Sequence, residues 1–167
     1  MTPSTASRVD LRREVEELYY REAWLLDHDK LEQWLELFTP DVRYWAPVRM
    51  NLPRGEEDFS QPFITPHFDE NYAGLQFRVA RSRTGMAFAE EYVRVRRFIS
   101  NVLILENDER TARVSSNFQL FKSRQDEQWF VGARDDRLAR NDDGVWRIRE
   151  RMVVLDHSVI DSITVYI

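Results

Sequence analysis

The chain has 167 residues, a formal net charge of −5 and no cysteine. This length suits one domain, which buries roughly 70% of its unfolded surface on folding. The lack of cysteine excludes disulfides, thiolate nucleophiles and cysteine-ligated iron–sulfur clusters, and the negative charge argues against nucleic-acid binding. With no apolar run of membrane-spanning length and no secretory signal, the expected location is the cytoplasm.

Two helices are predicted near the beginning of the chain. Residues 1–8 are small and polar and are expected to be loose. An apolar stripe along residues 10–27 predicts the first helix, and residues 29–38 have the same helical period. Asp29 and Glu32 have the spacing of a capping box, which would start the second helix.

The hydrophobic period changes from helical to alternating at Thr39-Pro40, which predicts that a helix leads directly into a strand. The inward side chains of that strand are expected to be Val42, Tyr44 and Ala46. Residues 49–66 combine prolines, a glycine and several acids without any period, so they predict a long loop. A third helix is expected over residues 69–83.

The rest of the chain alternates as strands do. Strands are predicted over residues 94–106, 112–124, 129–138 and 145–156, joined by polar turns into an antiparallel meander. In the first of them, Phe98, Val102 and Ile104 are assigned to one face, and Ile99, Leu103 and Leu105 to the other. Residues 158–167 are apolar to the end, and we expect them to be buried against their own sheet or against another subunit. The elements together predict an α+β fold in which a curved, mostly antiparallel sheet wraps three helices.

Five segments occur in an order that resembles one protein family. They are REAWLLDHDKLEQWLELF at 21–38, FTPDVRYWAPV at 38–48, HFDEN at 67–71, RVRRFISNV at 94–102 and RERMVVLD at 149–156. The chain resembles the small (beta) subunit of aromatic ring-hydroxylating dioxygenases, the group acting on benzene, biphenyl, naphthalene or phenylpropionate. The resemblance covers nearly the whole chain as a single domain, 1–167. It implies a cone-shaped fold like nuclear transport factor 2, ketosteroid isomerase and scytalone dehydratase.

The same resemblance implies partners and a role. A large (alpha) subunit would carry a Rieske 2Fe-2S cluster and a mononuclear non-haem iron, and electrons would come from a reductase and often a ferredoxin. The small subunits would form a trimer that supports three large subunits in a hexamer. This chain would be structural and non-catalytic, while the complex converts aromatic rings and O2 to cis-dihydrodiols. Without cysteine, the chain lacks half of the ligands that a Rieske cluster needs.

Several arginines and apolar residues are candidates for contacts between subunits. Arginine makes rigid two-pronged contacts, and Lys30 and Lys122 are the only lysines among 24 basic residues. The alternative is an ordinary solvated surface paired with neighbouring acids. The candidate interface residues are Arg96, Arg97, Asn101, Arg134, Arg137, Arg140, Ile163, Val165 and Ile167.

A stand-alone dehydratase or isomerase is the alternative function. Polar residues that could converge in the cone are Asp27, His28, Tyr44 and His67. Ala46 stands before Pro47, where isomerases of this fold place a carboxylate base. Simpler interpretations make Tyr44 a core residue, Asp27-His28 a polar turn and His67 a cap of the third helix. The three histidines lack the spacing of a compact metal site, and a third possibility is a binding module for a small apolar ligand.

Overall fold

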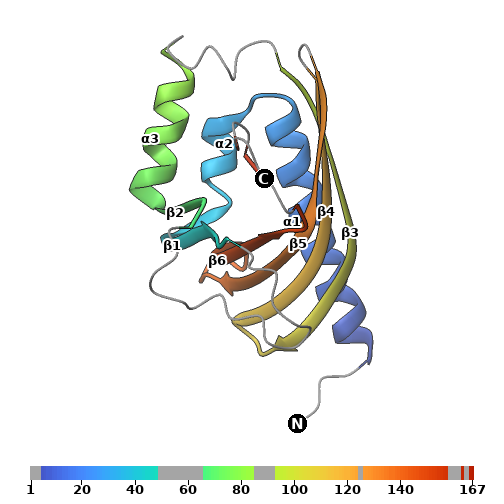
Figure 1. Ribbon diagram of the computed structural model, residues 1–167. Coiled ribbons are helices and arrows are strands. Elements are labelled where there is room, and N and C mark those ends of the chain that lie inside the picture. The colour runs from blue at the N-terminus through green and yellow to red at the C-terminus, as the bar shows by residue number, and fades with distance from the viewer. Residues whose placement is uncertain (1–4, 49–65, 85–92, 124–125, 158–162, 164–165) are drawn as a thin grey trace.

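The computed structural model describes residues 5–48, 66–84, 93–123, 126–157, 163 and 166–167, with side chains from residue 10 onward. Its elements follow the chain as shown in Figure 1. They are α1 (Thr5–Asp27), α2 (Leu31–Leu35), β1 (Phe38–Ala46), β2 (Phe68–Asn71), α3 (Tyr72–Ser82), β3 (Arg94–Asn107), β4 (Thr111–Ser123), β5 (Glu127–Arg140) and β6 (Trp146–Leu155). Nearly all of the predicted 49–66 loop falls outside the described residues.

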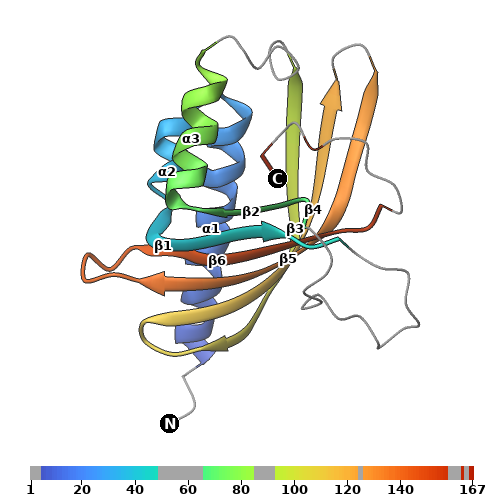
Figure 2. The same ribbon diagram turned by 60° about the vertical axis from the view of Figure 1, so that its left-hand side comes forward.

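The six strands form one sheet in the order β2-β1-β6-β5-β4-β3. Strands β3 to β6 pair as the predicted antiparallel meander, whereas β1 runs parallel to β6. The sheet is curved, and the three helices lie on one side of it, as both Figure 1 and Figure 2 show. The predicted α+β class, with helices on a curved and mostly antiparallel sheet, is therefore confirmed.

The helix limits near the beginning of the chain differ from the prediction. The first helix begins at Thr5, so residues 5–8 are helical rather than loose. The second helix is a short turn that ends at Leu35, and β1 begins at Phe38, before the proline that was expected to separate them. The predicted capping box is also wrong. Lys30 occupies the cap position without a side-chain hydrogen bond, and Asp29 has a φ of 55°.

Both residues of the expected capping box bind an arginine from another helix instead. The Arg83 guanidinium donates to the two carboxylate oxygens of Glu32 at 3.0 Å each, to the Asp29 main-chain oxygen at 2.9 Å and to the Asp29 carboxylate. A two-pronged ion pair is geometrically more specific than a single hydrogen bond. Arg83, just beyond α3, therefore ties the end of that helix to the beginning of α2.

The third helix starts three residues later than predicted. Residues Phe68–Asn71 pair with β1 as a short strand, and the Asn71 side chain caps α3 by accepting the Gly74 N–H at 2.9 Å. His67 does not cap the helix. Its main-chain N–H donates to the Ala46 oxygen at 2.8 Å, which extends the pairing of the two strands.

A bulge in β3 changes which side chains of that strand face inward. Asn101 has a φ of 53°, and the pairing with β4 shifts between Ser100 and Leu103. Beyond the bulge the alternation changes phase. Residues Ile99, Val102 and Ile104 belong to the core or pack against it, whereas Phe98, Leu103 and Leu105 are exposed. The predicted grouping of Phe98 with Val102 and Ile104 is wrong for this reason.

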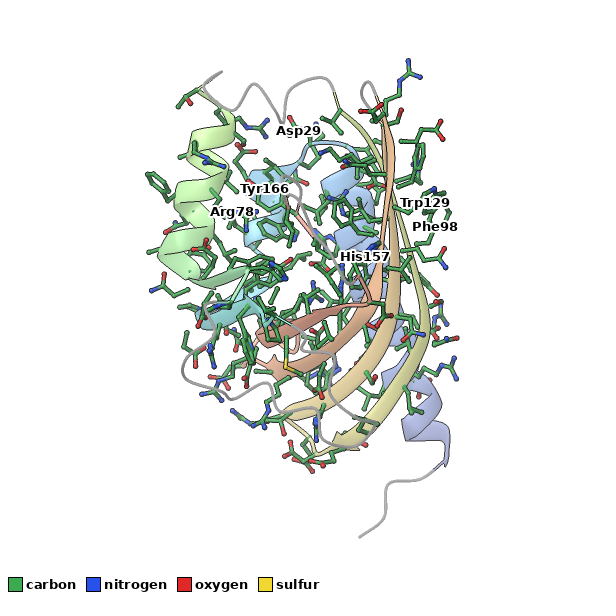
Figure 3. The ribbon with its side chains drawn as sticks, viewed as in Figure 1. Asp29, Arg78, Phe98, Trp129, His157 and Tyr166 are labelled. Atoms are coloured by element: carbon green, nitrogen blue, oxygen red, sulfur yellow. The ribbon has the colours of Figure 1, made fainter. Side chains whose placement is uncertain are left out.

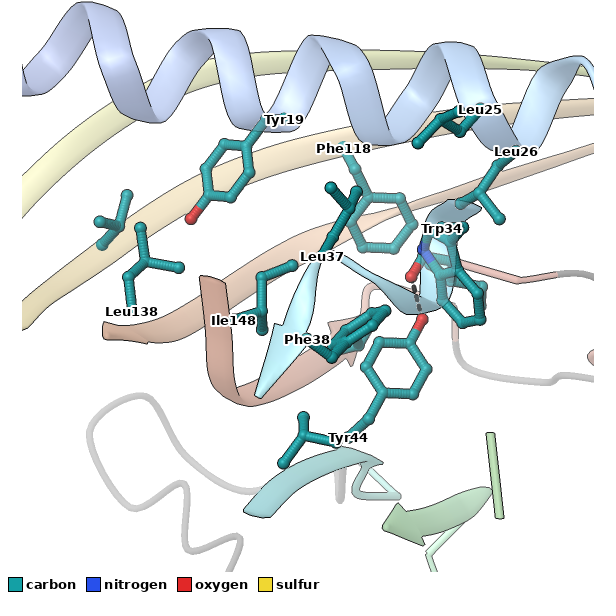
Figure 4. Packing of buried hydrophobic residues seen from close by; sticks show 14 of the residues in the cluster. Tyr19, Leu25, Leu26, Trp34, Leu37, Phe38, Tyr44, Phe118, Leu138 and Ile148 are labelled. Atoms are coloured by element: carbon teal, nitrogen blue, oxygen red, sulfur yellow. Dashed lines mark hydrogen bonds between the residues drawn. The ribbon is translucent and has the colours of Figure 1, made fainter. Parts of the chain in front are cut away.

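Large side chains from helices and sheet meet in one core (Figure 4). Fully burying one such side chain contributes roughly 1.5–3 kcal/mol. The predicted inward residues of β1, Val42, Tyr44 and Ala46, all belong to this core. Ile167 is also buried, and Ile163 and Tyr166 pack partly against the core. These three residues of the apolar end therefore pack on their own chain, while Val165 lies outside the described residues.

A glycine in β5 provides a test of how closely the sheet is packed. A Cβ at Gly132 would lie 2.1 Å from the Val154 main-chain oxygen and 3.0 Å from the Phe118 ring. We expect Gly132→Ala to lower the free energy of unfolding by about 3 kcal/mol, because backbone must move. Chemical denaturation of the purified variant measures the loss.

The control for this substitution is Gly144→Ala in the β5–β6 turn. Nothing lies within 4 Å of a Cβ there, but φ is +76°. The expected loss is about 1 kcal/mol, from backbone strain alone. Equal losses for the two variants would contradict the close approach at Gly132.

Candidate functional site

Four charged side chains are buried between the helices and the sheet. Arg151 of β6 donates two hydrogen bonds to Asp136 of β5, at 2.8 and 2.7 Å, and a third to Glu22 of α1 at 2.5 Å. Arg134 of β5 donates to the other Glu22 oxygen at 3.2 Å, and the Trp34 indole donates to Glu22 at 3.1 Å. Each of the four charged residues is at most 2% exposed. We call Glu22, Arg134, Asp136 and Arg151 the buried charge network.

The network shifts the ionisation of its own members. Burial works to raise the pKa of Glu22, but the charges of Arg151 and Arg134, with hydrogen bonds from Arg151 and Trp34, outweigh it, so this pKa is lowered. Burial, together with the Asp136 charge, raises the pKa of Tyr19 well above its ordinary value. Burial also raises the pKa of Tyr44. At neutral pH Glu22 is therefore ionised and both tyrosines are protonated.

This arrangement suits structure better than proton transfer. A general base needs a carboxylate that is free to accept a proton and a pKa near the working pH. Both oxygens of Glu22 and both of Asp136 already accept hydrogen bonds from arginines, and the pKa of Glu22 lies below its ordinary range. Two positive and two negative charges neutralise each other and join α1 to β5 and β6.

A second polar cluster lies where the last described residues meet the helices. Arg97 of β3 donates to Asp27 at 2.6 Å through Nη1, and to the Tyr166 main-chain oxygen through Nε and Nη2. The Tyr44 hydroxyl donates to the Ile167 main-chain oxygen, the bond dashed in Figure 4. Of the predicted cavity residues, Asp27 and Tyr44 thus lie inside the chain and are joined through Tyr166–Ile167.

The other two predicted cavity residues lie at the surface. His28 is exposed and stacks on Trp24, with ring centroids 4.4 Å apart. His67 is exposed at the start of β2. The structure therefore does not bring the four polar residues of the stand-alone enzyme hypothesis together.

The candidate interface residues divide between the inside and the outside of the chain. Arg97 and Arg134 are buried in the two clusters described above, as is Ile167 in the core. Arg96 and Asn101 are exposed on β3. Arg140 binds Glu14 and lies 4.8 Å from the centroid of the Trp146 ring.

Arg137 lines a polar hollow in the outer surface, about 930 Å³ in volume. Four arginines and four acids line this hollow, and each arginine forms an ion pair, such as Arg137 with Glu150 at 3.4 Å and Arg149 with Asp41 at 2.9 Å. The hollow is therefore lined by equal numbers of positive and negative side chains.

Apolar side chains also gather on the outer face of the sheet, away from the helices. Phe98, Leu103 and Leu105 of β3 are 50%, 59% and 41% exposed, and Trp129 of β5 is 49% exposed. The Trp129 ring contacts Phe121 with a centroid distance of 5.1 Å and stacks at 6.5 Å on Phe98, and Figure 3 shows Phe98 and Trp129 outside the sheet. We call Phe98, Leu103, Leu105, Phe121, Trp129 and Val131 the outer-face patch.

Sequence reasoning missed the buried charge network and the outer-face patch. The signal for the network is present, because Glu22 lies on the apolar stripe of α1 between Tyr19 and Leu26. Leu103 and Leu105 lie on the same face as Phe98 because of the bulge in β3, for which the alternation alone has no signal.

Neither a metal-binding group nor a membrane-spanning helix occurs among the described residues. No group of three or more His, Asp or Glu side chains there could hold a metal ion. None of the described helices is long and apolar enough to cross a membrane. A Rieske cluster does not fit this chain, because the whole sequence lacks the cysteine ligands.

Substitution of Glu22 tests the buried charge network. Glu22→Gln leaves two buried guanidiniums without their shared counter-charge, and we expect the free energy of unfolding to fall by about 3–5 kcal/mol. The control is Glu16→Gln, which removes an exposed helical ion pair with Arg12 and costs less than about 0.5 kcal/mol. Equal effects in urea denaturation would contradict the network's role.

Acid should weaken the same interaction. Because the pKa of Glu22 is lower in the folded chain than in the unfolded one, its contribution is complete above the unfolded pKa of about 4.3 and is lost as the pH falls through the folded value. The wild-type chain should lose stability more steeply than Glu22→Gln as the pH is lowered below about 5. Parallel pH profiles of the two proteins would exclude this linkage.

Known structures resemble this fold over nearly its whole length. The match to a structure of naphthalene 1,2-dioxygenase with indole bound in the active site has a TM-score of 0.79 and 23% identity, covering 99% of this chain and 95% of that one. The beta subunit of the benzoate 1,2-dioxygenase from Burkholderia mallei matches with a TM-score of 0.70 and 23% identity over 99% of both chains. A scytalone dehydratase-like protein from Novosphingobium aromaticivorans matches with a TM-score of 0.68 and 17% identity over 95% of both.

At these identities the structural matches establish the fold, which is that of the nuclear transport factor 2-like proteins expected from the sequence. Assignment to a family depends on the sequence itself. The family model described as "Ring hydroxylating beta subunit" matches residues 21–162, which is most of the chain. The chain therefore belongs to the family of ring-hydroxylating dioxygenase beta subunits.

Proposed function

We propose that this chain is the non-catalytic structural small subunit of a cytoplasmic aromatic ring-hydroxylating dioxygenase. As a single domain it supports large subunits that dihydroxylate aromatic rings with O2 to cis-dihydrodiols in the breakdown of aromatic compounds. Three copies form a trimer that carries three large subunits. A reductase, often with a ferredoxin, delivers the electrons.

The outer-face patch is the observation that carries this proposal. Six apolar side chains lie on three neighbouring strands, and large exposed apolar patches mark protein interaction sites. Aromatic residues are enriched at the centres of such interfaces. The patch gives the chain a surface that needs a partner subunit, and the exposed Arg96 and Asn101 lie on the same strand.

The interior supports a structural role. The carboxylates of Glu22 and Asp136 are fully engaged by arginines, and Asp27 is paired with Arg97. Ala46, which occupies the position of the carboxylate base in isomerases of this fold, is an apolar core residue. The large subunit would supply the Rieske cluster and the mononuclear iron.

A dehydratase or isomerase acting alone is the weaker alternative. Its support is the fold shared with the scytalone dehydratase-like protein and the interior positions of Asp27 and Tyr44. Its two histidines, His28 and His67, are exposed, however, and burial raises the pKa of Tyr44, so that its hydroxyl stays protonated. None of these three side chains is therefore a free base inside the cone.

Affinity purification of the tagged chain from its native host tests the proposal. We expect a near-stoichiometric larger protein, a native mass greater than that of one pair of subunits, and a visible spectrum with iron and Rieske absorbance. Trp129→Glu should abolish co-purification while leaving the melting temperature of the isolated chain nearly unchanged, because the side chain is half exposed.

The matched control is Phe77→Glu on α3. Phe77 is 70% exposed but lies outside the patch, so this variant should assemble as the wild type does. Normal assembly of Trp129→Glu would show that the patch is not an interface. A chain that emerges alone and colourless under conditions that preserve complexes would contradict the subunit role itself.

A further inference from the structure

The Tyr166 ring contacts both an indole and a guanidinium. The centroid of the Tyr166 ring is 4.9 Å from that of Trp34 in α2. The Arg78 guanidinium of α3 also lies 4.9 Å from the Tyr166 centroid. Arg78 also lies 5.5 Å from the Phe68 ring. Figure 3 shows Arg78 and Tyr166 facing each other across the space between α3 and the sheet. The indole contact is tilted, with an angle of 59° between the ring planes, so the Tyr166 ring gains an aromatic–aromatic contact as well as cation–π attraction.

The oxygen of the same residue is held by a buried arginine. Arg97 Nε and Nη2 donate to the Tyr166 main-chain oxygen at 3.1 and 2.6 Å, and the Arg97 side chain is only 4% exposed. These two donors form the edge of a guanidinium that matches the two oxygens of a carboxylate. Here both converge on one carbonyl oxygen. A carboxylate would give each donor its own oxygen and a negative charge.

The charges around this position also favour an anion. Arg97 is paired with Asp27, and Arg96 lies 3.7 Å from the same carboxylate. Arg78 adds a further positive charge beside the ring. Arg78, Arg96 and Arg97 thus carry three positive charges, against the one negative charge of Asp27. The Tyr44 hydroxyl, which donates to the Ile167 oxygen, is a second donor at the site.

We propose that Trp34, Tyr44, Arg78 and Arg97 form a binding site for a planar aromatic carboxylate, which Tyr166 and Ile167 occupy in this structure. The ring of the ligand takes the place of the Tyr166 ring, and its carboxylate takes the place of the main-chain oxygen on Arg97. The ligand binds by displacing these two residues. The site is separate from the outer-face patch, so the proposal does not depend on the role in assembly.

Because the competing group belongs to the same chain, it acts at a high effective concentration and weakens binding of the free ligand. Removing the ring removes most of that competition. Calorimetric titration of the full chain with benzoate should therefore show weak binding to the wild type and at least about tenfold tighter binding to Tyr166→Gly. Benzyl alcohol, which keeps the ring and lacks the charge, should bind Tyr166→Gly at least about tenfold more weakly than benzoate.

A second substitution distinguishes this site from a simple cavity. Arg78→Gln in the Tyr166→Gly background should reduce benzoate affinity several-fold and benzyl alcohol affinity by less, because the alcohol loses the cation–π contact alone while benzoate also loses attraction to its charge. A folded Tyr166→Gly chain that binds no benzoate, or that binds benzoate and benzyl alcohol equally, would overturn the proposal.

The wild-type chain provides a test that does not depend on the stability of any variant. Ile167 is buried in the same core as Trp34 and Tyr44, so its methyl NMR signals should be displaced from the positions of a free chain. Saturating benzoate should move them to those positions as Ile167 leaves the core. Signals that stay unchanged at benzoate concentrations far above physiological levels would exclude displacement.

Discussion

The position of the helices on the sheet depends on the Glu22 carboxylate. It accepts hydrogen bonds from Arg151, Arg134 and Trp34, so it joins α1 to α2, β5 and β6 at one point. Compared with a well-packed apolar core, a buried network of this kind adds little net stability, but removing one member leaves a charge that nothing neutralises. We infer that its main effect is on specificity, because Glu22 of α1 binds Arg134 of β5 and Arg151 of β6 at the same time.

The distribution of polar and apolar side chains is partly inverted in this chain. Fully paired arginines and acids fill space between the helices and the sheet, where related folds are expected to hold a reaction cavity, while aromatic residues are exposed on the opposite face. Carboxylates that are already paired with arginines are poorly suited to proton transfer. Exposed aromatic side chains are common where proteins bind one another. Together with membership of the beta-subunit family, these two features support the function proposed above.

The positions of the strands were predicted better from the sequence than their pairing and their contacts with the helices. Alternation located β3 to β6 within a few residues, and the change of period located β1, because both depend on local pattern. The parallel pairing of β1 with β6 and the binding of Asp29 and Glu32 to Arg83 connect residues far apart in the chain, which no local pattern contains. The bulge at Asn101 changes the phase of β3, so the exposure of Leu103 and Leu105 on the face of Phe98 could not be predicted from alternation. The inward position of Glu22, by contrast, could have been predicted from its place on an apolar stripe.

The fold is shared by proteins with different functions, so the function of this chain depends on what its surfaces contact. The most direct measurement is therefore an experimental structure of the complex purified from the native host. We predict that Phe98, Leu103 and Trp129 are buried against a neighbouring subunit, and that Glu22 remains bound to Arg134 and Arg151 inside the chain. A complex in which these apolar residues stay exposed to solvent would contradict the role of the outer-face patch, and a substrate bound beside Glu22 would contradict the structural role of the chain.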